Sequence, residues 1–359
     1  MPKQKKITLH DVAREVGVSS ASVSMILAGK NLNRFSDGTI DAVYRTAREL
    51  GYKMKRAKKD RRVVLIVCPS VINPYFATII QGMEQEAGAR GLKTLIMTTY
   101  WDIEKERYAC EFARNPIVCG VIFAMIPQDP VMVREVNTFV PVIAVGDKQS
   151  DVGLDTVDVN NFKAGTLVAE HLLSKGHTSI AYLSTSLNKE HSARVRRYEG
   201  LKSTIEKAGA TLHLYTTEVS SFVELNTIDI EHQSGRALAN RCMNQSPEVT
   251  AMVAVNDMVA YGVIDAIRDA GKEIPKDMSV CGFDNIYPSS FNGVKLTSVE
   301  HYIVEGGRSA VRLLCEKIEP NSNRTVERMA VTRVEYENKL VVRSSTGKPN
   351  TQQGGHGLE

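Results

Sequence analysis

Four polar side chains follow apolar runs of the chain, at positions where they could bind a small molecule: Asn73, Arg196, Asn256 and Asp284. Short, continuous apolar runs are typical of strands in a buried parallel sheet, and ligands bind beyond the carboxyl ends of such strands. One arginine, two asparagines and one aspartate offer hydrogen-bond donors and acceptors that suit a polyol such as a sugar. The same groups would also suit the ring nitrogens and amides of a purine.

Each of these side chains also has a purely structural alternative. Asn256 could cap the helix that follows it, and Asn73, which precedes a proline, could mark the start of another helix. Asp284 could brace a turn, and Arg196 could pair with an acidic residue. The sequence alone leaves both interpretations open for all four positions.

No pattern of residues indicates catalysis or a bound metal. The chain has none of the patterns GxGxxG, GxxxxGKS/T, HExxH or GxSxG, and its eight histidines are dispersed. Its six cysteines form no CxxC pair, and Cys68 and Cys281 lie within apolar runs. We therefore predict reduced, buried thiols, and a binding protein that is not an enzyme and that uses no cofactor.

Neither export nor membrane insertion is expected from the sequence. It contains no run of about 18 apolar residues. The N-terminal stretch is basic, but it lacks the apolar segment and the small-residue cleavage site of a secretory signal. These features predict a cytoplasmic protein with no membrane partner.

Residues 63–346 have the pattern of a scaffold for these side chains, because apolar runs alternate with amphipathic stretches. The expected strands are 63–68, 94–97, 120–123, 142–145, 179–183, 251–255 and 279–281, and the expected helices include 75–90, 161–175, 193–208 and 257–270. This alternation predicts an α/β body with parallel sheets. The segment is too long for one such sheet, which favours two lobes.

The charge of the chain is concentrated before this body. Residues 1–62 contain 15 Lys and Arg against 6 Asp and Glu, a net charge of +9 in a chain whose overall net charge is +4. Within this block, residues 53–62 hold seven basic residues and one acidic residue. A short basic block joined to a mildly acidic body is typical of a nucleic-acid-binding domain attached to a second domain.

The first 52 residues also have their own helical periodicity, which a solvated basic tail would lack. Thr8 can cap a helix with Asp11 as the acidic partner of a capping box, and Gly17 can end that helix. Ser19 can begin a second helix, and Ser36 can cap a third. Three short helices with a tight turn between the first two form the helix-turn-helix arrangement, here a small all-α domain.

The stretch ITLHDVAREVGVSSASVS, residues 7–24, closely resembles the head of LacI/GalR-family transcription regulators, and residues 34–39 and 50–52 continue the match. In the body, NPYF at 73–76, VNNFKAG at 159–165 and GFD at 282–284 recur in the same order in that family, so the resemblance covers residues 7–346. It implies a body of the periplasmic-binding-protein type I fold. Its two lobes would be joined by crossings near residues 160, 290 and 325.

By this resemblance, Ser20, Ala21 and Met25 occupy positions that read base edges in the major groove. The remaining predicted DNA-binding residues contact phosphates or dock the head, and they are Thr8, Ser19, Ser22, Ser24, Arg34, Ser36, Thr39, Tyr52, Lys53, Lys55 and Arg56. Many family members have arginine where Met25 stands. Arginine reads guanine with two hydrogen bonds, whereas methionine offers only apolar contact, for instance to a thymine methyl group.

The resemblance also places Arg196, Asn256 and Asp284 at effector-contacting positions. Asn73, Tyr75 and Asp147 complete the predicted effector site. Two departures from the family concern this site. Gly146 stands where many relatives have a ligand-binding aspartate, and the region near Ile230 lacks the aromatic residue that stacks on the ligand in many relatives. The aromatic residues that could replace it are Tyr75, Tyr100, Trp101, Phe222 and Tyr287.

The basic linker 53–62 is a third departure. Relatives usually have a longer linker that opens with Pro-Asn and carries a leucine which wedges into the minor groove, and this chain has neither feature. We expect phosphate attraction to contribute more of the affinity, with a steep salt dependence. The alternative is a basic linker that makes no fixed contacts.

These observations predict a transcriptional repressor whose affinity for operator DNA is controlled by a sugar-like molecule bound between the lobes. A purine or nucleoside ligand and gating by a protein partner are alternatives, while the DNA-binding head argues against a solute-binding transport protein. We expect a homodimer on a pseudo-palindromic operator. The expected segments are the head 1–52, the hinge 53–62, lobes 63–160 with 291–325 and 161–290 with 326–346, and a disordered tail 347–359.

Overall fold

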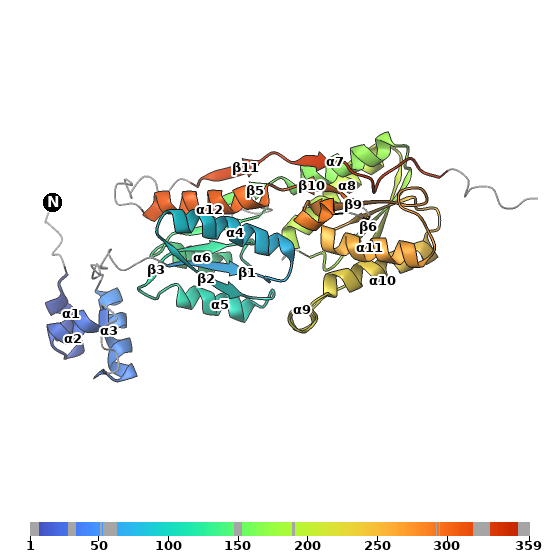
Figure 1. The fold of residues 1–359 in the computed structure, drawn as a ribbon. Coiled ribbons are helices and arrows are strands. Elements are labelled where there is room, and N and C mark those ends of the chain that lie inside the picture. Colours follow the sequence, from blue (N-terminus) through green and yellow to red (C-terminus); the bar gives the residue numbers. More distant parts are fainter. Residues whose placement is uncertain are drawn as a thin grey trace, which may run out of the picture.

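The computed structural model describes residues 7–27, 34–50, 52, 63–146, 153–188, 191–291, 293, 295–318 and 331–350. These residues form a small helical head and two α/β lobes that follow one another along the long axis in Figure 1. The order of elements confirms the predicted fold class.

The head consists of α1 (Leu9–Val16), α2 (Ser20–Leu27) and α3 (Asp37–Glu49). The predicted capping box is present at Thr8 and Asp11, and Gly17 ends α1 in the left-handed conformation with φ of 78°. The head has an apolar core of its own, formed by Val12, Ala13, Val23, Ile26, Val43 and Ala47. The three helices therefore form one packed unit.

The first lobe is built on a six-stranded sheet in the order β11-β5-β4-β3-β1-β2. Its strands are β1 (Val63–Cys68), β2 (Lys93–Thr98), β3 (Val118–Phe123), β4 (Val142–Val145), β5 (Asp155–Val159) and β11 (Arg333–Tyr336), and all neighbouring pairs are parallel. Helices α4 (Pro74–Ala89) and α12 (Ile303–Ile318) cover one face of this sheet, and α5 (Ile103–Phe112) and α6 (Pro130–Asn137) cover the other. Side chains of β1 alternate between these two apolar layers.

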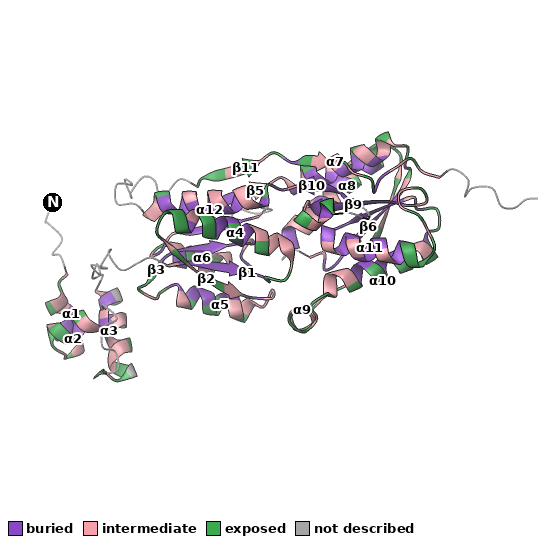
Figure 2. Ribbon diagram, viewed as in Figure 1, coloured by how far each residue is buried: buried purple, intermediate pink, exposed green. Residues whose placement is uncertain are grey.

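The second lobe has a sheet in the order β12-β10-β9-β8-β6-β7. Its strands are β6 (Ser179–Ser184), β7 (Thr211–Thr216), β8 (Ala251–Ala254), β9 (Ser279–Asp284), β10 (Thr297–Glu300) and β12 (Lys339–Val341), of which only β12 is antiparallel to its neighbour. Its helices are α7 (Asn161–Ser174), α8 (Ser192–Lys207), α9 (Ser221–Asn226), α10 (Ile230–Gln245) and α11 (Asp257–Asp269). Figure 2 shows the central strands of both lobes buried between helices whose outer faces are exposed, whereas the edge strands β2, β7, β11 and β12 are partly exposed.

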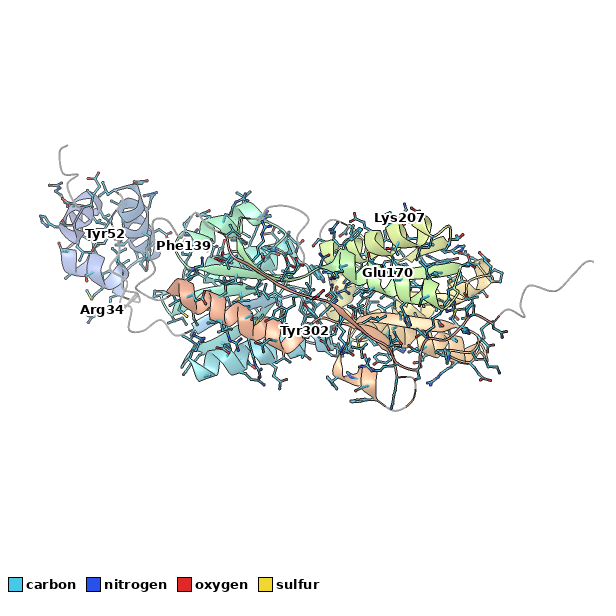
Figure 3. The ribbon with its side chains drawn as sticks, turned by 90° about the horizontal axis from the view of Figure 1, so that it is seen from above. Arg34, Tyr52, Phe139, Glu170, Lys207 and Tyr302 are labelled. Carbon is cyan, nitrogen blue, oxygen red and sulfur yellow. The ribbon has the colours of Figure 1, made fainter. Side chains whose placement is uncertain are left out.

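The chain crosses between the lobes three times, but two crossings differ from the expected positions. The first lies at residue 160, as predicted, between β5 and α7. The second lies at residues 301–302, not near 290, because β10 pairs with β9 and keeps the chain in the second lobe to Glu300. The third lies at residues 337–338, not near 325, because β11 pairs with β5 in the first lobe. Figure 3 labels Tyr302, which belongs to the second crossing.

The predicted disordered tail is partly wrong. Residues 347–350 pack on the second lobe, where the Gly347 N–H donates to Ser279 Oγ over 3.0 Å and the Asn350 amide donates to Asp277 over 3.3 Å. Residues 351–359 lie outside the described part of the chain.

All six cysteines are buried free thiols, as the sequence predicted. In the part of the chain that the structure describes, no helix is both long and apolar enough to cross a membrane. Within the same residues, no three His, Cys, Asp or Glu side chains are grouped so that they could hold a metal ion.

Candidate functional site

Helix α2 presents an accessible face of small residues. It buries Val23 and Ile26 against the head, whereas Ala21 and Ser24 are exposed and Ser20 and Met25 are half-buried. The Tyr44 hydroxyl of α3 donates to the Ile26 carbonyl over 2.9 Å and braces the end of α2. A helix with small side chains on its outer face can approach base edges closely in a DNA groove.

The other predicted DNA-binding residues of the head lie around this helix. Ser19 caps α2 by accepting from the Ser22 N–H over 3.0 Å, and Ser36 caps α3 by accepting from the Thr39 N–H over 3.2 Å. Thr8 and Arg34 are exposed, and Tyr52 packs on the head core. Figure 3 labels Arg34 and Tyr52 on the head. The hinge residues Lys53, Lys55 and Arg56 lie outside the described residues, so their assignment stays a prediction.

A buried arginine, Arg197 on α8, organises the polar groups between the lobes. Its Nε donates to Asn161 Oδ1 over 2.8 Å, its Nη1 to the Val255 carbonyl over 2.6 Å, and its Nη2 to Asp284 Oδ1 over 3.0 Å. The side chains of Arg197 and Asp284 are both more than nine-tenths buried. Three elements of the second lobe, α7, α8 and β9, therefore meet at one guanidinium group, together with the residue that follows β8.

Close packing of α7 on α8 places this arginine. A Cβ atom at Gly200 would lie 2.0 Å from the Phe162 carbonyl oxygen, and one at Gly165 would lie 2.1 Å from the Arg197 carbonyl oxygen. Only glycine allows the two helix backbones to approach so closely. This contact holds Arg197 against Asn161, at the first crossing between the lobes.

The assignment of Arg196 needs correction. Arg196 pairs with Glu199 on the surface of α8 over 3.0 Å, and its guanidinium lies 5.0 Å from the centre of the Phe162 ring. Its neighbour Arg197 makes the contact with Asp284 instead. One residue along a helix turns the side chain by about 100°, so Arg197 faces the polar groups and Arg196 does not.

Asp284 lies where β9 ends, with a left-handed φ of 100°. Besides Arg197, it contacts His301, whose Nδ1 lies 3.2 Å from Asp284 Oδ1. His301 belongs to the second crossing, and burial together with the nearby Arg197 charge lowers its pKa. Asp284 thus links the end of a central strand to a segment that joins the lobes.

Glu231, at the start of α10, connects the two lobes directly. Its Oε2 accepts from Asn73 Nδ2 of the first lobe over 2.7 Å, and its Oε1 accepts from Asn256 Nδ2 of the second lobe over 2.7 Å. Burial raises the pKa of this carboxyl group, and the Arg194 charge opposes that rise. Reasoning from the sequence did not find Glu231, because nothing in its local pattern distinguishes it from other acidic residues at helix starts.

Both asparagines also have the capping role that the sequence left open. Asn73 Oδ1 accepts from the Tyr75 N–H at the start of α4 over 2.8 Å, and Asn256 Oδ1 accepts from the Val259 N–H at the start of α11 over 2.9 Å. Capping uses only the side-chain oxygen, so each amide nitrogen remains for Glu231. The structural and the binding interpretations are therefore compatible at these two positions.

Tyr75 is the last predicted effector residue in the described region. Burial raises the pKa of its hydroxyl, and the charge of Asp284 raises it further while that of Arg197 lowers it. The Tyr75 hydroxyl group therefore lies near the charged side chains of Asp284 and Arg197. Asp147 lies outside the described residues.

A small recess opens in the second lobe beside Glu231, and Arg194 lies in its wall. Its lining residues are Thr185, His191, Arg194, Val219, Glu224, Ile230 and Glu231. Arg194 Nη1 donates to Thr185 Oγ1 over 2.8 Å. Burial and the Arg194 charge lower the pKa of His191 to about 3, so this ring is neutral at neutral pH. The recess combines one cation, two carboxyl groups and apolar side chains.

Comparison with known proteins gives one consistent result. Residues 61–339 match a family model described as periplasmic binding proteins and sugar binding domain of LacI family. The chain is 28% identical over 346 residues to the HTH-type transcriptional repressor PurR of Haemophilus influenzae (strain PittEE), covering 94% of this chain and 98% of that protein. It is 29% identical over 359 residues to the HTH-type transcriptional regulator DegA of Bacillus subtilis (strain 168), covering 96% of this chain and 100% of that protein.

A solved structure agrees with these sequence matches. A LacI family transcriptional regulator from Enterococcus faecium, determined with bound ribose, aligns with a TM-score of 0.68 and 26% identity. The alignment covers 80% of this chain and 100% of that chain.

Proposed function

The chain belongs to the LacI family, and on that premise we propose that it is a transcriptional regulator, a repressor, whose affinity for operator DNA is set by an uncharged polyol bound between its lobes. The observation that carries the proposal is the interlobe cluster, formed by Asn73, Asn161, Arg197, Glu231, Asn256, Asp284 and His301. It joins both lobes through hydrogen bonds that a ligand's hydroxyl groups could replace. The protein acts by binding in the cytoplasm, not by catalysis.

The charges near this cluster favour an uncharged ligand. Glu224, Glu231 and Asp284 contribute three carboxyl groups against the guanidinium groups of Arg194 and Arg197, and Arg197 is already paired. A phosphate group would add further negative charge to this poorly hydrated region, which is unfavourable. We therefore propose an unphosphorylated sugar, and the ribose in the Enterococcus faecium relative supports this ligand class.

Coupling between the two sites requires a ligand that binds one arrangement of the lobes better than another. The lobes are joined by three crossings, and Glu231 accepts hydrogen bonds from residues of both lobes. A ligand that replaces one of these bonds changes the relative position of the lobes, and with it the spacing of two heads in a dimer. Coupling energies of this kind are typically about 1–3 kcal/mol.

At the DNA, α2 supplies base contacts and the basic hinge supplies phosphate contacts. Each neutralised phosphate adds about 0.9 to the slope of log affinity against log salt concentration. Replacing Lys53, Lys55, Lys58 and Lys59 with alanine should therefore lower this slope. An unchanged slope would indicate a hinge that makes no fixed contacts.

A thermal-shift screen tests the ligand class most economically. Sugars, sugar phosphates, nucleosides and purine bases are compared at equal concentration, since a ligand that binds only the folded state raises its stability by RT ln(1 + [L]/Kd). The proposal predicts stabilisation by one or more unphosphorylated sugars. Stabilisation by purines or nucleosides alone would contradict it and favour a purine effector.

A further inference from the structure

The wall of the recess in the second lobe contains no large aromatic ring. Of its lining residues only His191 is aromatic, and Ile230 is aliphatic. Polyols with ring structures have apolar faces, and such a face needs an apolar partner if it is to leave water. The described part of the second lobe does not place such a partner in the recess wall.

The first lobe places an aromatic ring against residues of this wall. Trp101 lies between β2 and α5, and its ring centre is 4.5 Å from that of His191 at an angle of 47°. The guanidinium carbon of Arg194 lies 5.9 Å from the centre of the Trp101 ring. Burial raises the pKa of the Glu224 carboxyl group, and the nearby Trp101 side chain opposes that rise. Trp101 thus lies beside three residues that line the recess, all of them in the other lobe.

The backbone that carries Trp101 is held in an unusual conformation. Tyr100 and Trp101 have φ values of 53° and 59°, in the left-handed region that non-glycine residues rarely adopt. Two such residues in succession cost free energy and persist only where surrounding contacts enforce them. Here the Thr99 and Tyr100 N–H groups donate to the Cys68 and Pro69 carbonyls over 2.9 and 2.8 Å.

The two residues of this turn have different environments. The Tyr100 ring has Lys105 Nζ 4.8 Å from its centre, within its own lobe. The Trp101 ring instead reaches the second lobe. The strained turn at Tyr100 and Trp101 therefore directs the Trp101 side chain across the boundary between the lobes.

We propose that Trp101 is a specificity-determining residue that packs from the first lobe against the wall of the recess and stacks on the ring of an unphosphorylated sugar. Glu224 and Glu231 would accept hydrogen bonds from the hydroxyl groups of the sugar, and the Arg194 guanidinium group would donate hydrogen bonds to its oxygen atoms. This inference rests on the proposed function, since it assigns a residue to the same ligand. It also explains how the site has a stacking surface although Ile230 is aliphatic.

Trp101 is the chain's single tryptophan, so its fluorescence reports this site alone. The experiment titrates the full chain with D-ribose, D-glucose, cellobiose and ribose 5-phosphate, and it records thermal stability, tryptophan emission and quenching by acrylamide. A sugar that stabilises the protein should shift the emission and lower the acrylamide quenching constant about twofold or more. This measurement needs no substitution, so it does not depend on whether a variant folds.

Variants then separate stacking from a general effect on the turn. Trp101→Ala should weaken sugar binding about tenfold, which corresponds to the loss of one aromatic contact. Trp101→Phe, which keeps a ring, should weaken binding less. Tyr100→Ala is the matched control, because it removes the neighbouring aromatic ring of the same turn, and Kd should stay within about twofold.

The possible failures are distinguishable. If none of the three sugars stabilises the protein, the proposed ligand class is wrong, and the role of Trp101 is overturned with it. If a sugar binds but leaves both emission and quenching unchanged, or binds Trp101→Ala as tightly as the unaltered chain, only the assignment of Trp101 is overturned. Tight binding of ribose 5-phosphate would contradict the exclusion of phosphorylated ligands.

Discussion

Replacing Arg197 with methionine should destabilise the protein far more than the same substitution at Arg196. Methionine keeps an unbranched apolar chain at both positions and removes only the guanidinium group. At Arg197 this group donates to Asn161, to a backbone carbonyl and to Asp284. At Arg196 it pairs only with Glu199 and lies over an aromatic ring, and 34% of its side chain is exposed.

The expected magnitudes follow from burial. Removing one member of a buried ion pair typically costs about 3–5 kcal/mol, because the other charge is left buried and unpaired. An exposed pair typically contributes about 0–1 kcal/mol. Since the whole free energy of unfolding is about 5–15 kcal/mol for most proteins, Arg197→Met removes a large fraction of it and Arg196→Met does not.

Urea unfolding followed by far-ultraviolet circular dichroism measures both variants. A third chain, Arg197→Met with Asp284→Asn, removes the orphaned charge and should recover part of the loss. Equal losses for Arg196→Met and Arg197→Met would refute the assignment of Arg197 as the organising residue. A double variant no more stable than Arg197→Met would show that the ion pair with Asp284 is not the source of the effect.

Three further predictions concern packing, pH and DNA. On α4, Gly82→Ala should destabilise the protein by about 2 kcal/mol or more in urea unfolding, because a Cβ atom there would lie 2.2 Å from the Val304 carbonyl oxygen. Gly88→Ala on the same helix is the control. Since a Cβ atom at Gly88 would meet open space, this change should be neutral or slightly stabilising. Burial raises the pKa of Glu106 to about 7, above its usual value of 4.5. The folded state therefore binds this proton more tightly than the unfolded state, and stability should fall by up to about 3 kcal/mol as pH rises from 4.5 to 7; a Glu106→Gln chain with the same pH dependence would contradict this. Selection from a random DNA library should show no strong guanine requirement opposite Met25, and Met25→Arg should create one; a guanine requirement in the unaltered chain would refute the apolar contact.

Sequence reasoning succeeded where the local pattern determines the structure. The caps Thr8, Ser19 and Ser36 and the terminating Gly17 all act as predicted, because capping depends on residues within one helical turn. The seven predicted strands are present because buried parallel strands are continuous apolar runs.

Reasoning from the sequence failed where tertiary contacts determine the structure. Strands β10 and β11 are short and partly polar, with the sequences TSVE and RVEY, and only pairing with β9 and β5 makes them strands. The sequence pattern therefore predicts two of the crossings too early in the chain. The resemblance points to Arg196, and the pattern of the predicted helix does not show that its neighbour Arg197 is the buried one. Glu231 was not found because its partners come from two lobes.

The central claim is that a ligand bound between the lobes alters the affinity for DNA. Fluorescence anisotropy of the full chain on its selected DNA site, at fixed salt and with or without a saturating sugar identified by the thermal-shift screen, tests this most directly. We predict a change in Kd of about 5–150-fold, which corresponds to a coupling free energy of about 1–3 kcal/mol. A sugar that saturates the site and leaves Kd for DNA unchanged would contradict the account.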